Sequence, residues 1–187
     1  MWNKFTALYK KEIAIIFAMP VAYAVISVFA VLSGYFFATI ANYYAMVSLR
    51  SMNQYQRMMW DLSMIDGIFR PYFHNVVVVM IIMFPLITMR LFSEEKREGT
   101  AELLFTYPVS DMAIVLSKFF AALTVFVAML VCSMISFLIL RTTSQYEILP
   151  VLAGFLGLLL VGASFLALGL FISSLTDSQI VAAVISF

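Results

Sequence analysis

Charged side chains are scarce in this chain of 187 residues. Asp, Glu, Lys and Arg make up 11% of it, whereas they make up about 25% of a typical soluble domain. Hydrophobic residues reach 64%, above the roughly 45–50% of soluble domains. This composition excludes an ordinary soluble domain and predicts an integral membrane protein. The net charge of +1, with no basic tract, gives no support to nucleic-acid binding.

Cysteine and histidine each occur only once. Cys132 lies inside an apolar run, so it provides neither a disulfide framework nor a paired-cysteine metal site, and we expect it to pack as a small apolar side chain. His74 lies near the start of another apolar run, where packing or helix capping is favoured over metal ligation. The 13 methionines are spread along the chain, which favours packing over a soft-metal site. We expect no metal site and no cofactor in this chain.

Familiar catalytic motifs are also missing. The sequence has no His-Glu-x-x-His helix, no nucleotide-binding glycine loop and no Gly-x-Ser-x-Gly turn. The long apolar runs carry no deeply placed acidic residue, which argues against proton or sodium coupling. We therefore expect no catalytic residue, and any ATP hydrolysis must come from another subunit.

Long apolar runs dominate what is present. A membrane-spanning helix needs about 20 mainly apolar residues, each adding about 1.5 Å. A fifth run begins at Ile180 and rises only about 12 Å by Phe187, so we expect it to be a truncated span. The predicted fold class is all-α, a polytopic membrane helix bundle with at least five spans. The four complete runs are Ile13–Ile40, Tyr72–Met89, Met112–Leu140 and Ile148–Ile172.

We expect a single transmembrane domain over residues 1–187. Methionine and leucine at helical spacing predict one or two interfacial helices in the outer segment that follows the first span. The predicted segments are an interfacial helix (1–12), spans at 13–40, 72–90, 112–140 and 148–172, an outer segment (41–71), a charged loop (91–111) and the start of a fifth span (179–187).

The placement of lysine and arginine predicts a cytoplasmic N-terminus. In that orientation seven basic residues lie on the cytoplasmic side and four lie outside. Lys118 joins the cytoplasmic set by extending its side chain toward the interface. The other cytoplasmic residues are Lys4, Lys10, Lys11, Arg90, Lys96 and Arg97, and the outer ones are Arg50, Arg57, Arg70 and Arg141.

Residues 1–12 are predicted to form a short amphipathic helix in the cytoplasmic interface, because apolar and polar side chains occur there at helical spacing. The pattern fits either a contact near a cytoplasmic partner or a simple membrane anchor. The residues that define this interfacial helix are Trp2, Phe5, Tyr9, Lys10, Lys11 and Glu12.

Residues 93–108, SEEKREGTAELLFTYP, form the one compact charged island between long apolar runs, with six of the chain's 21 charged residues in its first ten positions. Gly99 can adopt the left-handed conformation that ends a helix, and Thr100 can cap the next one. That next helix, Ala101–Thr106, is barely two turns long, so packing must hold it. The candidate contact residues are Glu94, Glu95, Lys96, Arg97, Glu98, Gly99, Thr100, Glu102, Leu103, Leu104 and Phe105.

A solvated loop with salt bridges inside its own helix explains the charge pattern of this island equally well. A catalytic role for Glu94 and Glu95 is weaker, because an open loop has no buried pocket to raise the pKa of a carboxyl. After the loop, Ser110 and Asp111 are expected to cap the third span.

Proline and glycine mark the predicted spans. Pro20 and Pro85 each remove a backbone hydrogen bond and allow a kink, which can act as a pivot or simply be packed. We also expect a small-residue face on the fourth span for close helix packing. It is formed by Ala153, Gly154, Gly157, Gly162 and Gly169.

Two stretches together carry a family resemblance over about a third of the chain. They are residues 9–37, YKKEIAIIFAMPVAYAVISVFAVLSGYFF, and residues 85–116, PLITMRLFSEEKREGTAELLFTYPVSDMAIVL. The second resembles the permease subunits of type-2 ABC exporters, from the second span through the coupling helix into the third. The first is similar to the N-terminal signature of one group among them, the gliding-motility (GldF-like) permeases. Such permeases have six spans.

The resemblance implies an ATP-driven exporter of the bacterial cytoplasmic (inner) membrane. Two permease subunits, identical or different, would sit on two ABC ATPase subunits that bind ATP and Mg²⁺, with a periplasmic or membrane accessory protein as a further partner. The loop after the second span would dock in a groove on the ATPase. The charges of Glu94–Glu102 would face the ATPase, and the apolar side chains of Leu103–Phe105 would be the buried side of the coupling helix.

Two other functions stay open at this point. One is a membrane scaffold or assembly subunit that keeps the fold and binds proteins without transporting cargo. The other is an intramembrane enzyme, which the sequence disfavours because no nucleophile or metal set is visible.

Overall fold

A computed structural model describes residues 2–50, 64–93, 96, 99, 110–144, 146–176 and 178–186. The described residues form helices and contain no strand, which confirms the all-α helix bundle. The elements are α1 (Trp2–Ala18), α2 (Pro20–Arg50), a π-helix η1 (Ile65–Phe69), α3 (Arg70–Thr88), α6 (Asp111–Thr143), α7 (Ile148–Leu175) and α8 (Gln179–Ser186).

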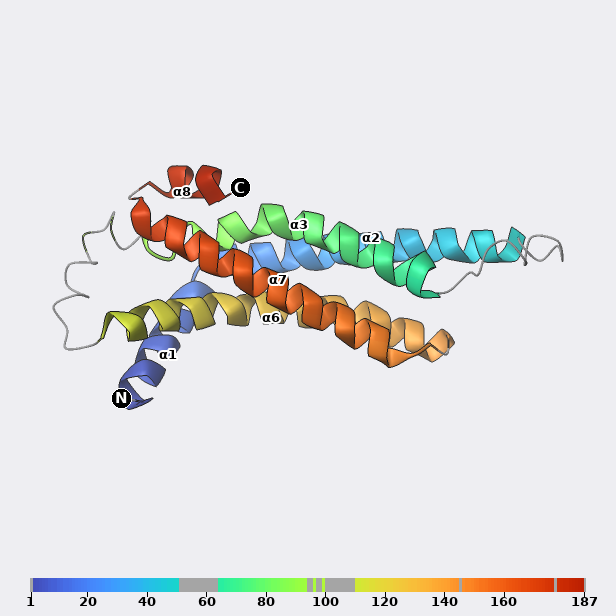
Figure 1. Cartoon of the computed structure of the whole chain (residues 1–187), viewed down its shortest axis with the longest axis horizontal. Coiled ribbons are helices and arrows are strands. Elements are labelled where there is room, and N and C mark those ends of the chain that lie inside the picture. The colour runs from blue at the N-terminus through green and yellow to red at the C-terminus, as the bar shows by residue number, and fades with distance from the viewer. Residues whose placement is uncertain are drawn as a thin grey trace.

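Four long helices lie side by side in the bundle (Figure 1). Each of α2, α3 with η1, α6 and α7 is long and apolar enough to cross a membrane. One end, which we call the α1 end, holds α1, the last turns of α3 and α7 and the first turns of α6 (Figure 1). The short helix α8 packs against α3 and α7 at the same end. The opposite end, where α6 leads into α7, is called the far end.

The first span differs from its predicted bounds because the helix breaks at Met19. Proline disfavours helical backbone at the residue before it and cannot donate a backbone hydrogen bond, so α1 ends at Ala18 and Pro20 begins α2. Pro20 therefore marks a boundary between two helices and is not a kink inside a span. The N-terminal helix extends past Glu12 to Ala18, and α2 continues beyond Ile40 to Arg50.

Pro85 lies inside α3, as the sequence predicted. The helix continues past it, and the backbone N–H of Met89 donates to the Pro85 carbonyl at 2.9 Å. The second span also begins slightly earlier than predicted, because η1 leads directly into α3 at Arg70.

Aromatic rings join all four spans toward the far end. The Phe137 ring of α6 lies 5.1 Å from Phe37 of α2, 4.9 Å from Tyr72 of α3 and 5.4 Å from Phe155 of α7, measured between ring centroids. Such pairs contribute about 0.5–1.5 kcal/mol each beyond the burial of their area. The hydroxyl groups of Tyr72 and Ser133, both buried, hydrogen-bond to each other beside these rings. This cluster holds the far half of the bundle together.

The small-residue face of α7 is narrower than the sequence predicted. A side chain added at Gly154, Gly162 or Gly169 would lie closer than 3.0 Å to Phe73, Phe126 or Thr88, respectively. A side chain at Gly157 would meet nothing within 4 Å. Close packing on α7 therefore depends on the three glycines at spacings of eight and seven residues, whereas Gly157 and the exposed Ala153 lie off this face.

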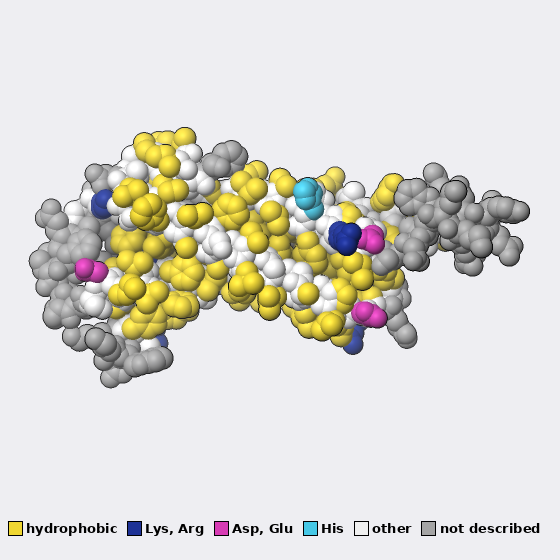
Figure 2. Space-filling view, in the orientation of Figure 1, with side chains coloured by type: hydrophobic (Ala, Val, Ile, Leu, Met, Phe, Trp, Pro, Cys, Tyr) yellow, Lys and Arg dark blue, Asp and Glu magenta, His cyan; other side chains and the backbone are white. Residues whose placement is uncertain are grey.

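The outer surface of the spans is apolar. Leu149, Leu160 and Leu168 of α7 are exposed, as are many other large apolar residues of the spans. In the view of Figure 2 hydrophobic side chains cover the middle of the molecule, and the described charged side chains lie toward its two ends. A surface of this kind is unfavourable in water and favourable in lipid, which supports a multi-pass membrane protein.

Candidate functional site

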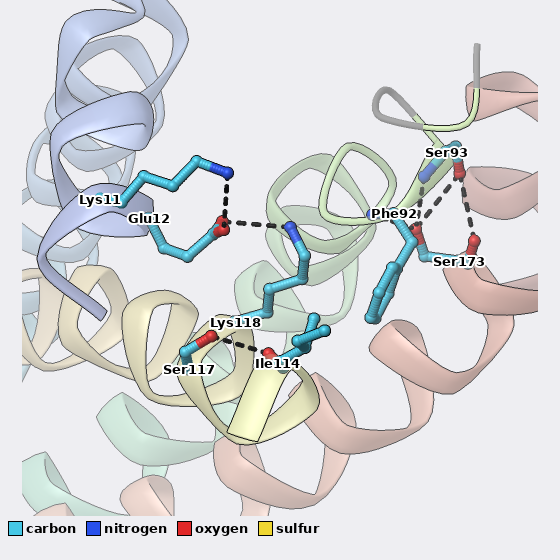
Figure 3. Close-up of polar contacts among 8 residues, drawn as sticks. All are labelled: Lys11, Glu12, Phe92, Ser93, Ile114, Ser117, Lys118 and Ser173. Atoms are coloured by element: carbon cyan, nitrogen blue, oxygen red, sulfur yellow. Dashed lines mark hydrogen bonds and ion pairs between the residues drawn. The ribbon is translucent and has the colours of Figure 1, made fainter. Parts of the chain in front are cut away.

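A buried ion pair joins α1 to α6 at the α1 end. The Nζ of Lys118 lies 3.1 Å from Oε2 of Glu12, and the two residues are only 1% and 4% exposed. Figure 3 shows the Lys118 and Lys11 ammonium groups pointing toward the Glu12 carboxylate. Lys118 therefore does not extend to the interface as predicted, and Glu12 does not lie on a solvated face of α1. An isolated charge at either position would be costly inside the bundle, so each residue is positioned by the other.

Phe92 brings the start of the charged loop to the same point. The Lys118 Nζ lies 5.2 Å from the centroid of the Phe92 ring, within range of a cation–π contact. Phe92 is buried, and it follows directly after the last turns of α3. Lys118 thus contacts α1 through Glu12 and the segment that follows α3 through Phe92.

The apolar side of α1 packs on α6. The Tyr9 hydroxyl hydrogen-bonds to Thr124 Oγ1 at 2.7 Å. The Phe5 ring stacks on Tyr9 and meets the edge of Phe120, at centroid distances of 6.4 and 6.1 Å. Lys10, on another side of the helix, is exposed. The N-terminal helix is therefore bound to the bundle along its length, and Trp2 is part of that helix.

A second contact fastens the loop to the end of α7. The buried Ser173 Oγ accepts hydrogen bonds from the backbone N–H groups of Phe92 and Ser93, at 3.2 and 3.4 Å, and meets the Ser93 hydroxyl at 3.2 Å (Figure 3). The Lys96 Nζ donates to the Ser174 carbonyl at 2.7 Å. A Ser-Ser pair near the end of an apolar span gave no signal of this role in the sequence. We define residues Glu12, Phe92, Ser93, Lys96, Lys118, Ser173 and Ser174 as the loop anchor.

Two predicted features of the loop lie on described residues, at Gly99 and at Ser110. Gly99 has a φ of +70°, in the left-handed region that was expected, and its N–H donates to the Lys96 carbonyl at 3.1 Å. Ser110 occupies the N-cap position of α6 and Asp111 its first turn, but the Ser110 side chain makes no capping hydrogen bond. The other candidate contact residues lie outside the described residues: Glu94, Glu95, Arg97, Glu98, Thr100, Glu102, Leu103, Leu104 and Phe105.

The loop anchor contains residues that sequence reasoning missed or misplaced. Lys118 is the one charge in its apolar run, and that isolation was the available signal that it needs a buried partner. Glu12 was placed with Lys10 and Lys11 at the polar positions of the predicted amphipathic helix. Distances of about 80 and 106 positions along the chain separate the partners Ser93–Ser173 and Glu12–Lys118. Only the tertiary structure brings such residues together.

The fold and its surface define the class of protein, a multi-pass helical membrane protein with its polar anchor at one end. Residues 54–187 match the family of ABC-2 family transporter proteins. The match covers well over half of the chain, so the protein belongs to this family and is an ABC-2 type permease. Family membership implies a transport role in a bilayer together with an ABC ATPase. No curated protein and no solved structure matches the chain.

Proposed function

We propose that this chain is the permease subunit of an ATP-driven exporter, with a cytoplasmic N-terminus and a coupling helix in residues 93–108 that docks on a separate ABC ATPase. The loop anchor is the observation that carries the proposal. A loop that serves only as a solvated connection has no need of buried contacts to two other helices. This one leaves α3 and is at once bonded to α7 through Ser173 and packed on Lys118 of α6.

The anchor supports a short mechanical path from the loop to three helices. Movement of the loop would pull on α7 through the Ser93–Ser173 contacts and on α6 through Phe92 and Lys118. From Lys118 the buried ion pair leads to α1, which packs along α6. Because a packed interior transmits displacement with little loss, motion of an ATPase bound to the loop would reach the bundle as a shift of whole helices.

Within the loop, charge and apolar side chains have separate proposed roles. Glu94, Glu95, Arg97, Glu98 and Glu102 would form the docking face. Leu103, Leu104 and Phe105 would pack beneath it, as an amphipathic helix does in a groove. Lys96 differs from its neighbours, since it already donates a hydrogen bond to the end of α7.

The second subunit, the membrane and the permease group are proposed from the sequence resemblance alone. The complex would hold a second permease subunit, identical or different, and lie in the bacterial cytoplasmic membrane. The signature that is similar to gliding-motility permeases, Tyr9–Phe37, lies outside the residues matched to the family. The resemblance of this signature to the gliding-motility group is the basis on which we propose cell-surface or motility-related export.

The test reverses charge in the loop. Glu98→Lys combined with Glu102→Lys is expected to weaken association with the ATPase about tenfold or more, because like charges brought together at an interface cost several kcal/mol. Copurification and the stimulation of ATP hydrolysis are the measurements. Glu147→Lys is the matched control, since Glu147 is exposed at the far end.

Each outcome has a distinct meaning. If the double variant binds and stimulates the ATPase as well as the unchanged protein does, the docking assignment is wrong. If the ATPase binds but cargo never stimulates its activity in vesicles, the chain is a scaffold and not a transporter.

A further inference from the structure

A cavity of about 310 Å³ lies at the α1 end, between α1, α2, α3 and α6. Its wall is mostly apolar and includes Ile16, Val25 and Ile87. Two further wall residues, Ile15 and Leu86, are each 37% exposed on the outer surface. The cavity therefore reaches the apolar surface that faces the lipid, and it is separate from the contacts between Ser93 and Ser173.

The charges that line this cavity are unbalanced. Three cations, Lys11, Arg90 and Lys118, face it with one carboxylate, Glu12. The Glu12 carboxylate lies 3.1 Å from the Lys118 ammonium and 4.0 Å from that of Lys11. The formal charge of the lining is thus positive, and the carboxylate is already engaged by the two lysines.

Arg90, which lines this cavity, carries an unsatisfied hydrogen-bond donor. Its Nε is buried and has no hydrogen-bond partner among the described residues. Within the described part of the chain its Nη1 donates to the thioether of Met19, at 3.9 Å, and a thioether is a weak acceptor. A buried guanidinium N–H without a partner is costly, so an oxygen-rich anion at this position would stabilise the site.

We propose that this cavity binds an anionic phospholipid from the leaflet that borders the α1 end. The guanidinium of Arg90 holds a phosphate oxygen of the headgroup, for which its planar set of N–H donors is suited. The first part of an acyl chain lies along Ile87 and Val25 and leaves the cavity past Ile15 and Leu86. The volume is at the lower end of ligand pockets, about 300–1,000 Å³, which fits a headgroup and part of a chain with the remainder in the bilayer.

The binding site belongs to the bundle and does not depend on the proposed ATPase docking. The test is native mass spectrometry of the intact permease in detergent, titrated with dioleoyl-phosphatidylglycerol or with dioleoyl-phosphatidylcholine. We expect the anionic lipid to bind at least about tenfold more tightly, and Arg90→Gln to remove about tenfold of its affinity. Arg90→Lys should lose part of it, because a lysine keeps the charge without the planar donors.

Lys10→Gln is the matched control, because Lys10 is an exposed cation on the same helix as Lys11 and does not line the cavity. Ala22→Leu provides a second variant that leaves all charges in place and fills the apolar wall, where Ala22 is 7% exposed. It should also lower lipid binding, and it decides the matter if Arg90→Gln does not fold. Equal binding of the two lipids would overturn the proposal, as would a loss with Lys10→Gln as large as with Arg90→Gln. So would displacement of the lipid by inorganic phosphate alone, since that would make the site one for free phosphate.

Discussion

Lys118 is stabilised at its buried position by residues of other elements and not by its own helix. It lies in the second turn of a long apolar helix and is almost completely buried. Burial of a lone ammonium is unfavourable, and the Glu12 carboxylate at 3.1 Å together with the Phe92 ring at 5.2 Å makes the position tolerable. The pair contributes little net stability compared with apolar side chains of the same shape, but it specifies where α1 lies on α6.

Lys118→Met should destabilise the protein by about 3–5 kcal/mol, because Glu12 would remain buried without its cation. Combining it with Glu12→Gln should recover most of the loss, since no unpaired charge would remain. Stability is measured by unfolding in detergent. Lys10→Met, at an exposed position, should change it by less than about 0.5 kcal/mol. If the single and double variants lose the same stability, the ion pair does not position α1.

At the scale of elements, α7 packs closely on its neighbouring helices because glycine occupies three positions of the contact and places no side chain there. Gly162 lies against Phe126 and Phe84, and Gly169 lies against Thr88. Thr88 is buried, and its hydroxyl donates to the Phe84 carbonyl at 3.0 Å, so it has little freedom to move away. The end of α7 that carries Ser173 is therefore held tightly against α3 just before the loop begins.

Gly169→Ala should cost about 1–3 kcal/mol, because the added methyl group overpacks the contact with Thr88. Gly157→Ala on the same helix is the control and should be neutral or slightly stabilising, since its methyl group meets nothing within 4 Å and alanine favours helix. Thermal unfolding in detergent compares the two. Equal losses would mean that helix propensity, and not packing on α3, decides the role of these glycines.

In the whole molecule, the α1 end and the far end differ in their polar groups. The loop anchor, which includes the buried ion pair, lies at the α1 end (Figure 3). The cavity lies at the same end. At the far end the Arg70 guanidinium and the Asp66 carboxylate form an exposed ion pair at 2.9 Å, which contributes little stability. Among the described side chains, lysine and arginine are more numerous at the α1 end, which supports the proposed orientation with that end in the cytoplasm.

Single cysteines test this orientation in a Cys132→Ser background. In intact cells a membrane-impermeant maleimide should label Glu147→Cys, at the far end, and leave Lys10→Cys unlabelled. In inverted vesicles the pattern should reverse. Both positions are exposed, so failure to react reflects the side of the membrane and not burial. Labelling of Lys10→Cys in intact cells would show that the N-terminus lies outside.

Residue patterns predicted the spans of the fold, but not every helix boundary or every close contact between helices. Apolar runs of sufficient length identified the four spans, because a helix satisfies its own backbone polar groups and needs only an apolar surface in lipid. The break at Met19 was predicted only as a possible kink at Pro20, because the apolar residues on both sides of this proline read as one continuous span. Likewise Gly157 and Gly169 look alike in the sequence, and only the neighbouring helix distinguishes them.

The sequence alone determined that this is a helical membrane protein and where its charged loop lies, because composition and apolar run length act locally along the chain. The tertiary structure alone decided which side chains meet at the start of that loop. Ser173, Lys118 and Glu12 come from three different helices, and the free energy of burying a charge or a hydroxyl depends on the partner that packing provides. Such partners have no fixed spacing in sequence, so the loop anchor and the cavity beside Arg90 emerge only when the helices are packed.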